Sequence, residues 1–140
     1  MSATTKPVRF GVLFSGAFPL LRAIEGSVLA DKLGYDGIAC NEHHQTAYGL
    51  MPSPNIVAAA LARRTSRARI LILGNAIGFR SDPLRVAEEI AMLDHFSKGR
   101  VVSGFVRGLG WEYFAQGVPP ARSRERFNEN DDSLSVLRSD

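Results

Sequence analysis

Four short apolar runs recur along the sequence at a spacing that few folds can use. They cover residues 8–14, 36–41, 69–77 and 100–107, so successive runs start about 30 residues apart, the length of a βα unit. Residues 70–73 (ILIL) are continuously apolar rather than alternating. That pattern is typical of a parallel strand buried on both faces. The runs therefore predict four parallel strands.

Segments with helical periodicity separate these runs. Two of them open with a capping residue followed by proline, Ser53-Pro54 and Asp82-Pro83, a pair that favours the first helical turn. Gly34 stands where the first helix would end. The predicted apolar helix faces are Leu20, Ile24 and Val28; Val57, Ala60 and Leu61; Val86, Ile90 and Leu93; and, from a start near Ser123, Phe127, Leu134 and Leu137.

Strand and helix alternate in a way that predicts one α/β domain of (βα)4 organisation over residues 1–140, with polar residues 1–7 disordered. An open doubly wound sheet or one half of a (β/α)8 TIM barrel, typically about 250 residues long, could use this order. A dinucleotide-binding open sheet needs G-x-G-x-x-G after its first strand. The turn after the first strand contains a single glycine, Gly16, and after the fourth strand Tyr113 occupies the third glycine position. The sequence therefore lacks the motif that a dinucleotide-binding fold requires.

Composition excludes several classes of function. The chain is 45% hydrophobic and 22% charged with a net charge of +3, as in ordinary soluble proteins. Its arginine clusters lack the stacking aromatics of a nucleic-acid surface, and the single cysteine, Cys40, rules out an internal disulfide. No apolar window approaches the ~18 residues of a membrane span, and no signal peptide precedes the fold. We expect a cytoplasmic protein that binds neither nucleic acid nor membrane.

Candidate site residues follow three of the predicted strands at their carboxyl ends, where ligands bind in both architectures. They are Glu42, His43 and His44 after the second strand, Asn75 and Ala76 in the third, and Arg107 and Gly108 after the fourth. An acid, two imidazoles, an amide and a guanidinium are thus directed to one end of the sheet.

The two adjacent histidines suit proton transfer better than metal binding. Strand alternation places Glu42 and His44 on one side and His43 on the other, whereas a metal pair on one strand would favour histidines two apart. The remaining histidine, His95, ends a helix, so we expect no metal site. Hydrogen bonds to loop backbone, or proton exchange with a bound ligand, both remain open for these side chains.

Arg107 leads into a glycine-containing turn at 108–110. Glycines let backbone amides approach an anion, and a guanidinium fork suits phosphate. A surface ion pair with Glu112 is an equal alternative. The three aromatic residues between positions 111 and 114 are expected to pack and, secondarily, to line a ligand site.

Several motifs together resemble bacterial luciferase and the luciferase-like monooxygenase family. They are the strand end Glu42-His43-His44, the helix segment 82–94 (DPLRVAEEIAMLD), the turn 97–100 (SKGR) and the strand end 107–109 (RGL). The resemblance covers nearly the whole chain. It implies the N-terminal half of a TIM barrel that uses reduced FMN. In this family, reduced FMN and O2 form a C4a-peroxyflavin that oxidises an organic substrate.

The resemblance also implies roles for individual residues. His43 matches the active-site histidine beside the flavin, and Arg107 matches the arginine that contacts the flavin phosphate. The resemblance also points to His43 as the partner of Glu42, although strand alternation favours His44, and we follow the resemblance here. Asn75 and Ala76 lie where the third strand passes the isoalloxazine ring. Val106 stands where luciferase has a reactive cysteine, so no thiol chemistry is expected there.

Two alternative functions remain open: an oxidoreductase that uses the deazaflavin F420 without oxygen, and a non-catalytic flavin-binding or truncated assembly module. Four strands would leave the inner face and two edges of the sheet exposed. We therefore expect a homo-oligomer, a complementary half-barrel, or a fragment of a longer protein. The expected source of reduced FMN is a flavin reductase.

Overall fold

The computed structural model describes residues 8–15 and 19–136, and its strands form one parallel sheet in the order β1-β2-β3-β4. The strands are β1 (Gly11–Phe14), β2 (Gly37–Cys40), β3 (Arg69–Ala76) and β4 (Val101–Val106). The predicted strands and the (βα)4 organisation are confirmed. The disorder predicted for residues 1–7 concerns a segment outside the described residues.

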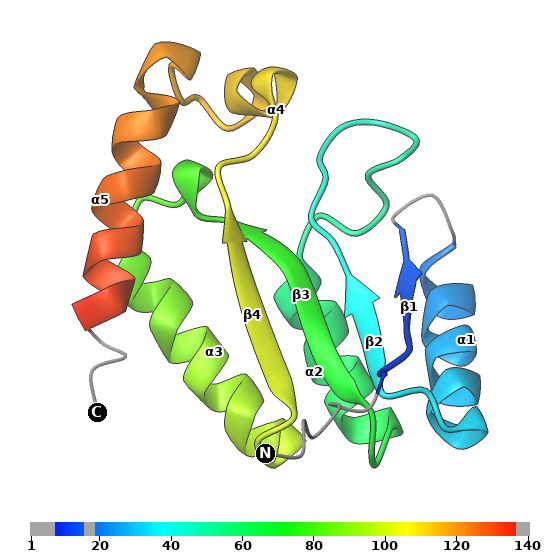
Figure 1. Cartoon of the computed structure of the whole chain (residues 1–140). Helices are drawn as coiled ribbons and strands as arrows, with labels where there is room; N and C mark the ends of the chain where they lie inside the picture. Colours follow the sequence, from blue (N-terminus) through cyan, green and yellow to red (C-terminus); the bar gives the residue numbers. More distant parts are fainter. Residues whose placement is uncertain (1–7, 16–18, 137–140) are drawn as a thin grey trace, which may run out of the picture.

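Helices follow each strand. They are α1 (Leu20–Leu33), α2 (Pro54–Arg64), α3 (Pro83–Ser97), α4 (Gly110–Ala115) and α5 (Ser123–Val136), with 3-10 turns η1 (Ile77–Phe79) and η2 (Pro120–Arg122). Figure 1 shows that α1, α2 and α3 lie on one side of the sheet, whereas no helix lies on the side facing the viewer. The sheet therefore has one covered and one open face among the described residues.

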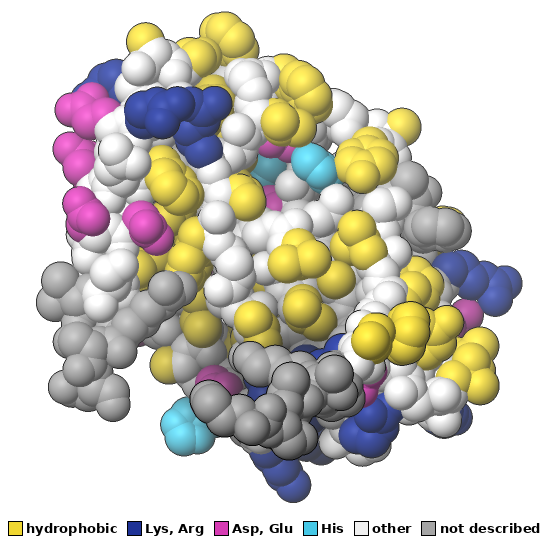
Figure 2. Space-filling model, in the orientation of Figure 1, with side chains coloured by type: hydrophobic (Ala, Val, Ile, Leu, Met, Phe, Trp, Pro, Cys, Tyr) yellow, Lys and Arg dark blue, Asp and Glu magenta, His cyan; other side chains and the backbone are white. Residues whose placement is uncertain are grey.

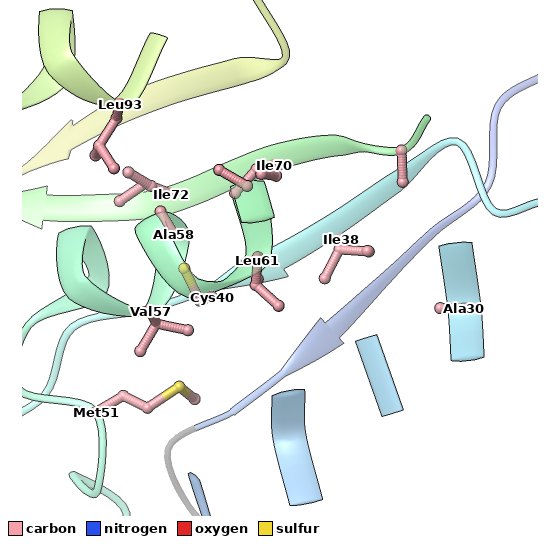
Figure 3. Close-up of a cluster of buried hydrophobic side chains, with 12 residues drawn as sticks. Ala30, Ile38, Cys40, Met51, Val57, Ala58, Leu61, Ile70, Ile72 and Leu93 are labelled. Atoms are coloured by element: carbon pink, nitrogen blue, oxygen red, sulfur yellow. The ribbon is translucent and has the colours of Figure 1, made fainter. Parts of the chain in front are cut away.

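The hydrophobic core lies between the covered face of the sheet and these helices. Ile38, Ile70 and Ile72 are completely buried, and Figure 3 shows side chains of both strands, α2 and α3 meeting in one cluster. Burying each such side chain contributes about 1.5–3 kcal/mol. Cys40 belongs to the same cluster, and burial raises the pKa of its thiol to about 12.

Helix α1 follows the predicted apolar face only in part: Ile24 packs against the core and Val28 is half-buried, but Leu20 is exposed. Small residues, including Ala23 and Ser27, are its buried positions, and Leu20 is 40% exposed. The reason is close packing, since a Cβ at Gly26 would lie 2.7 Å from the ring of Phe14. The predicted helix boundaries are confirmed. Gly34 ends α1 with φ 94°, and the Asp82 side chain accepts N–H hydrogen bonds at the start of α3.

The open face of the sheet is apolar. Leu13 and Leu73 are each 51% exposed and Val106 is 41% exposed, while residues at the intervening positions in β3 are buried under the helices. Hydrophobic side chains are spread over this face in Figure 2. In a closed barrel this face would be the interior, so its composition fits the predicted barrel half.

A buried carboxylate anchors the turn that starts β3. Asp31 accepts hydrogen bonds from the backbone N–H groups of Ser66 (2.9 Å), Arg67 (3.1 Å) and Ala68 (2.7 Å), and from the Ser66 hydroxyl (3.2 Å). Burial disfavours the charged form of Asp31, but these hydrogen bonds outweigh it and hold its pKa below the ordinary value. The anchor sets where β3 begins.

We predict that Asp31→Ala lowers the free energy of unfolding by about 3 kcal/mol at pH 7, because three backbone N–H groups lose their acceptor. The folded-state pKa is depressed, so the stabilisation is present above the unfolded pKa of about 3.9 and is lost as the pH falls through the folded value. Urea unfolding at pH 7 and pH 3 measures both effects. Asp132→Ala, an exposed control on α5, should change stability by less than about 0.5 kcal/mol. An equal loss for Asp31→Ala at both pH values would contradict this account.

Candidate active site

A cavity of about 330 Å³ opens at the carboxyl ends of β3 and β4, a volume within the range of small-molecule sites. Apolar side chains form part of its wall, and polar groups lie on one side. The lining residues are Leu73, Val106 and Leu109, the backbone of Gly74 and Gly108, and the polar side chains of Glu42, His43, Arg107 and Glu112. Figure 2 shows histidine and acidic side chains together in a hollow above the open sheet face.

Glu42 joins the ends of two strands. Its side chain is fully buried, and one oxygen accepts a hydrogen bond from the N–H of Ala76 at 2.9 Å. The other oxygen lies 2.8 Å from His44 Nε2 and accepts a hydrogen bond from Arg80 at 3.1 Å. A buried carboxylate is costly unless it is paired. Arg80 supplies that pairing charge.

A second buried carboxylate, Glu112 of α4, holds the neighbouring histidine. One of its oxygens lies 3.2 Å from His43 Nδ1 and accepts the N–H of His44 at 2.9 Å. Its other oxygen accepts the N–H of Leu109 at 2.9 Å. Glu112 is only 1% exposed, so it connects the loop after β2 to the turn after β4.

Aromatic rings pack around these polar groups. Phe79 contacts the rings of His44 and Tyr113 edge-on, with centroids 5.7 and 4.6 Å away. Tyr48 lies against His43 at 4.8 Å. The Tyr113 hydroxyl donates to the carbonyl of Arg107. Burial raises the pKa of Tyr113, which keeps this donor protonated.

The positions of the histidines follow strand alternation, so the expectation from the resemblance that His43 is the partner of Glu42 is wrong. His44 contacts Glu42, as the alternation predicts, and its Nδ1 lies 3.4 Å from Gln116 Nε2. His43 lies on the other side, lines the cavity and contacts Glu112 instead. The two imidazoles therefore have different carboxylate partners, and only His43 is at the cavity.

The third strand reaches the cavity earlier than the predicted Asn75 and Ala76. The Asn75 side chain is fully buried and donates to Ser103 at 3.0 Å, and the N–H of Ala76 donates to Glu42. Leu73 and Gly74 line the cavity instead. The pairing of β3 with β4 shifts register between residues 72 and 75, which breaks the side-chain alternation.

Arg107 and Gly108, the two candidate residues at the end of the fourth strand, both line the cavity. Arg107 is exposed, and Gly108 has φ 94°, where an added Cβ would meet the Phe79 ring at 2.3 Å. Within the described residues, no ion pair joins Arg107 to Glu112, because Glu112 is used by the histidine segment and Leu109.

The structure corrects the expectation that the aromatic residues after this turn all pack. Tyr113 is buried, but Trp111 is 55% and Phe114 is 77% exposed. Sequence reasoning also missed helix α4, which is too short for apolar periodicity. A signal was present, since a glutamate three residues after a helix start often accepts the backbone N–H there, as Glu112 does from Leu109.

Two structural findings bear on metals and membranes. Among residues 8–15 and 19–136, no group of three or more His, Cys, Asp or Glu side chains could hold a metal ion. No helix in the same part of the chain is both long and apolar enough to cross a membrane.

Comparison with known proteins decides the family. The sequence profile described as "Luciferase-like monooxygenase" matches residues 4–138. The chain belongs to the luciferase-like monooxygenase family. It is 29% identical over 139 residues to 4-hydroxyprotoasukamycin monooxygenase of Streptomyces nodosus subsp. asukaensis, covering 93% of this chain and 37% of that protein. It is 31% identical over 108 residues to limonene 1,2-monooxygenase of Rhodococcus erythropolis, covering 76% and 28%.

Solved structures place the same fold in this family. Monooxygenase RslO1 from Streptomyces bottropensis superposes with a TM-score of 0.87 and 30% identity, covering 95% of this chain and 44% of that one. Two more distant structures share the fold. One is the oxygenating constituent of 3,6-diketocamphane monooxygenase from Pseudomonas putida in complex with FMN (20% identity, TM-score 0.81; 89% of this chain and 37% of that one). The other is the coenzyme F420-dependent tetrahydromethanopterin reductase from Methanopyrus kandleri (23%, 0.66; 82% and 32%).

The (βα)4 sheet is therefore a portion of the luciferase-like TIM barrel, as the sequence predicted. The chain spans between 28% and 37% of the two curated relatives and 44% of RslO1. These relatives contain further structure beyond the matched part.

We predict that Glu42→Ala lowers the free energy of unfolding by about 2–3 kcal/mol, because it leaves the Ala76 N–H without an acceptor, whereas the partly exposed Arg80 charge stays in contact with water. Urea unfolding followed by far-UV circular dichroism measures the change. Glu129→Ala on the exposed side of α5 is the matched control. A loss below about 1 kcal/mol for Glu42→Ala would show that the buried carboxylate is not structural.

Proposed function

We propose that this chain carries the FMN-binding part of a monooxygenase active site, in which reduced FMN and O2 oxidise a small organic substrate beside His43. The observation that carries the proposal is the strand-end cavity, where the His43 imidazole, held by buried Glu112, and the Arg107 guanidinium meet an apolar wall. Membership of a monooxygenase family supports it.

The residues at the cavity fit the two parts of FMN, its flat ring system and its phosphate. Leu73 and Val106 present apolar surface that a flat ring system could cover, and both are about half exposed on the open sheet face. Arg107 stands beside them as an exposed cation, and its planar donor fork matches a phosphate group. When bound, reduced FMN would supply the electrons that activate O2.

The chain's own residues have four tasks in this proposal. Arg107 binds the phosphate, while the apolar wall limits access of water to the reacting atoms. His43 exchanges a proton with the bound molecules, since its ring lies at the cavity. Glu42 and His44 hold the strand ends in place.

The identity of the electron carrier can be tested directly. Consumption of reduced FMN that requires O2 would support the monooxygenase proposal. Reduction of F420 without O2 would instead make the protein an F420-dependent oxidoreductase. Absence of any flavin affinity would favour a non-catalytic module. We further propose that a flavin reductase supplies the reduced FMN, and that a second copy or a complementary half-barrel covers the open sheet face.

We predict that Arg107→Ala weakens FMN binding about 10- to 100-fold and riboflavin binding less than about twofold, because only FMN carries the phosphate that the guanidinium would contact. Fluorescence titration of both ligands measures the difference. Arg124→Ala, an exposed arginine on α5, is the control and should leave both affinities unchanged. Equal losses for the two ligands would make Arg107 a structural residue.

We predict that His43→Ala reduces substrate oxygenation about 100-fold or more while the dissociation constant for FMN changes less than about threefold, because a positioned acid–base group acts on the chemical step. Product formation and flavin titration are measured on the same preparation. His95→Ala near the end of α3, where the side chain is exposed, is the matched control. Unchanged turnover in His43→Ala would remove this residue from the mechanism.

A further inference from the structure

The adjacent histidines are held through different ring nitrogens. His43 presents Nδ1 to Glu112 at 3.2 Å, whereas His44 presents Nε2 to Glu42 at 2.8 Å. The other nitrogen of His44, Nδ1, lies 3.4 Å from the side-chain nitrogen of Gln116. Among the described residues, His43 Nε2 has no hydrogen-bond partner.

These contacts determine where each neutral imidazole carries its hydrogen. An ionised carboxylate is only an acceptor. Both oxygens of Glu112 accept backbone N–H groups, those of His44 and Leu109, which is the arrangement of an ionised carboxylate. His43 must therefore donate from Nδ1, leaving Nε2 with a lone pair. His44 must donate from Nε2, leaving Nδ1 as the acceptor that faces Gln116.

The two carboxylates also differ in charge balance. Arg80 lies 3.1 Å from Glu42 and compensates its charge. Within the described part of the chain, the only ion-pair partner of Glu112 is the His43 ring. A buried carboxylate without a permanent cation stabilises the positive charge that its histidine gains on taking up a proton.

We propose that Glu112 is the positioning residue for His43. It holds the Nδ1–H form, so that the free Nε2 accepts a proton at the cavity, and it then stabilises the imidazolium that results. His44 has both ring nitrogens engaged and serves as a structural link to Glu42. The part of this inference that concerns turnover rests on the proposed function, while the position of the hydrogens is a property of the flavin-free chain.

The first experiment is ¹⁵N NMR of the histidine side chains in the flavin-free chain at about pH 9, above the ordinary histidine pKa of about 6.5. His43→Gln and His44→Gln variants assign the signals. The expected spectrum shows His43 protonated at Nδ1 and His44 protonated at Nε2. A His43 protonated at Nε2 in the unmodified chain would overturn the proposal without any Glu112 variant.

The second experiment compares Glu112→Gln with Glu125→Gln, the same change at an exposed position of α5. In Glu112→Gln, His43 should become a mixture of both forms while His44 stays protonated at Nε2; Glu125→Gln should change neither. Retention of the single Nδ1–H form in a folded Glu112→Gln chain would contradict the assignment. Should that variant fail to fold, Glu112→Asp keeps the carboxylate, and the Nδ1–H form should persist there.

Turnover separates this inference from the proposed function. With substrate and reduced FMN, Glu112→Gln should lower kcat about 10-fold or more with KM and FMN affinity within about twofold, and Glu112→Asp should recover part of kcat. A chain that shows the expected histidine forms but binds no FMN would refute the proposed function and leave the Glu112 assignment intact. A chain that binds FMN but carries the His43 hydrogen on Nε2 would refute the Glu112 assignment and leave the proposed function intact.

Discussion

The hydrogen bond from the Ala76 N–H to the buried carboxylate of Glu42 is the contact on which the carboxyl end of the sheet depends. It ties the loop after β2 to the last residue of β3, so neither segment can move independently. The same carboxylate receives Arg80 and His44. One buried acid thus accepts a backbone hydrogen bond, pairs with a cation and orients an imidazole. Because these contacts fix the surrounding backbone, the neighbouring cavity keeps its shape.

Support for this acid extends to the last helix. Arg126 donates to the carbonyls of Gly78 and Arg80, and Asn130 donates to those of Ile77 and Arg80. These bonds hold η1, and through it the backbone from which Arg80 reaches the site. Helix α5 contributes no side chain to the cavity lining, yet it keeps that lining in position. The contacts that hold both imidazoles come from within this chain.

The strands, the helix boundaries and the barrel family were predictable from the sequence because each depends on local patterns: apolar runs, capping residues and the spacing of motifs. Two features were not predictable. The register shift in β3 turns Asn75 away from the cavity. No residue type in the sequence indicates that such a shift occurs there. The role of Glu112 depends on a contact 69 positions from His43, and only the folded chain brings those two side chains together.

The buried thiol of Cys40 has a consequence for durability. Burial raises the pKa of this thiol to about 12, so at neutral pH it stays in the thiol form rather than the reactive thiolate. If the flavin chemistry proposed for this site releases hydrogen peroxide, that oxidant would attack thiolates and exposed thioethers. Cys40 and Met51 are shielded in the core, whereas Met92 on α3 is 54% exposed. We therefore expect such oxidation to affect Met92 on the exposed surface of α3 before it reaches Cys40 or Met51 in the core.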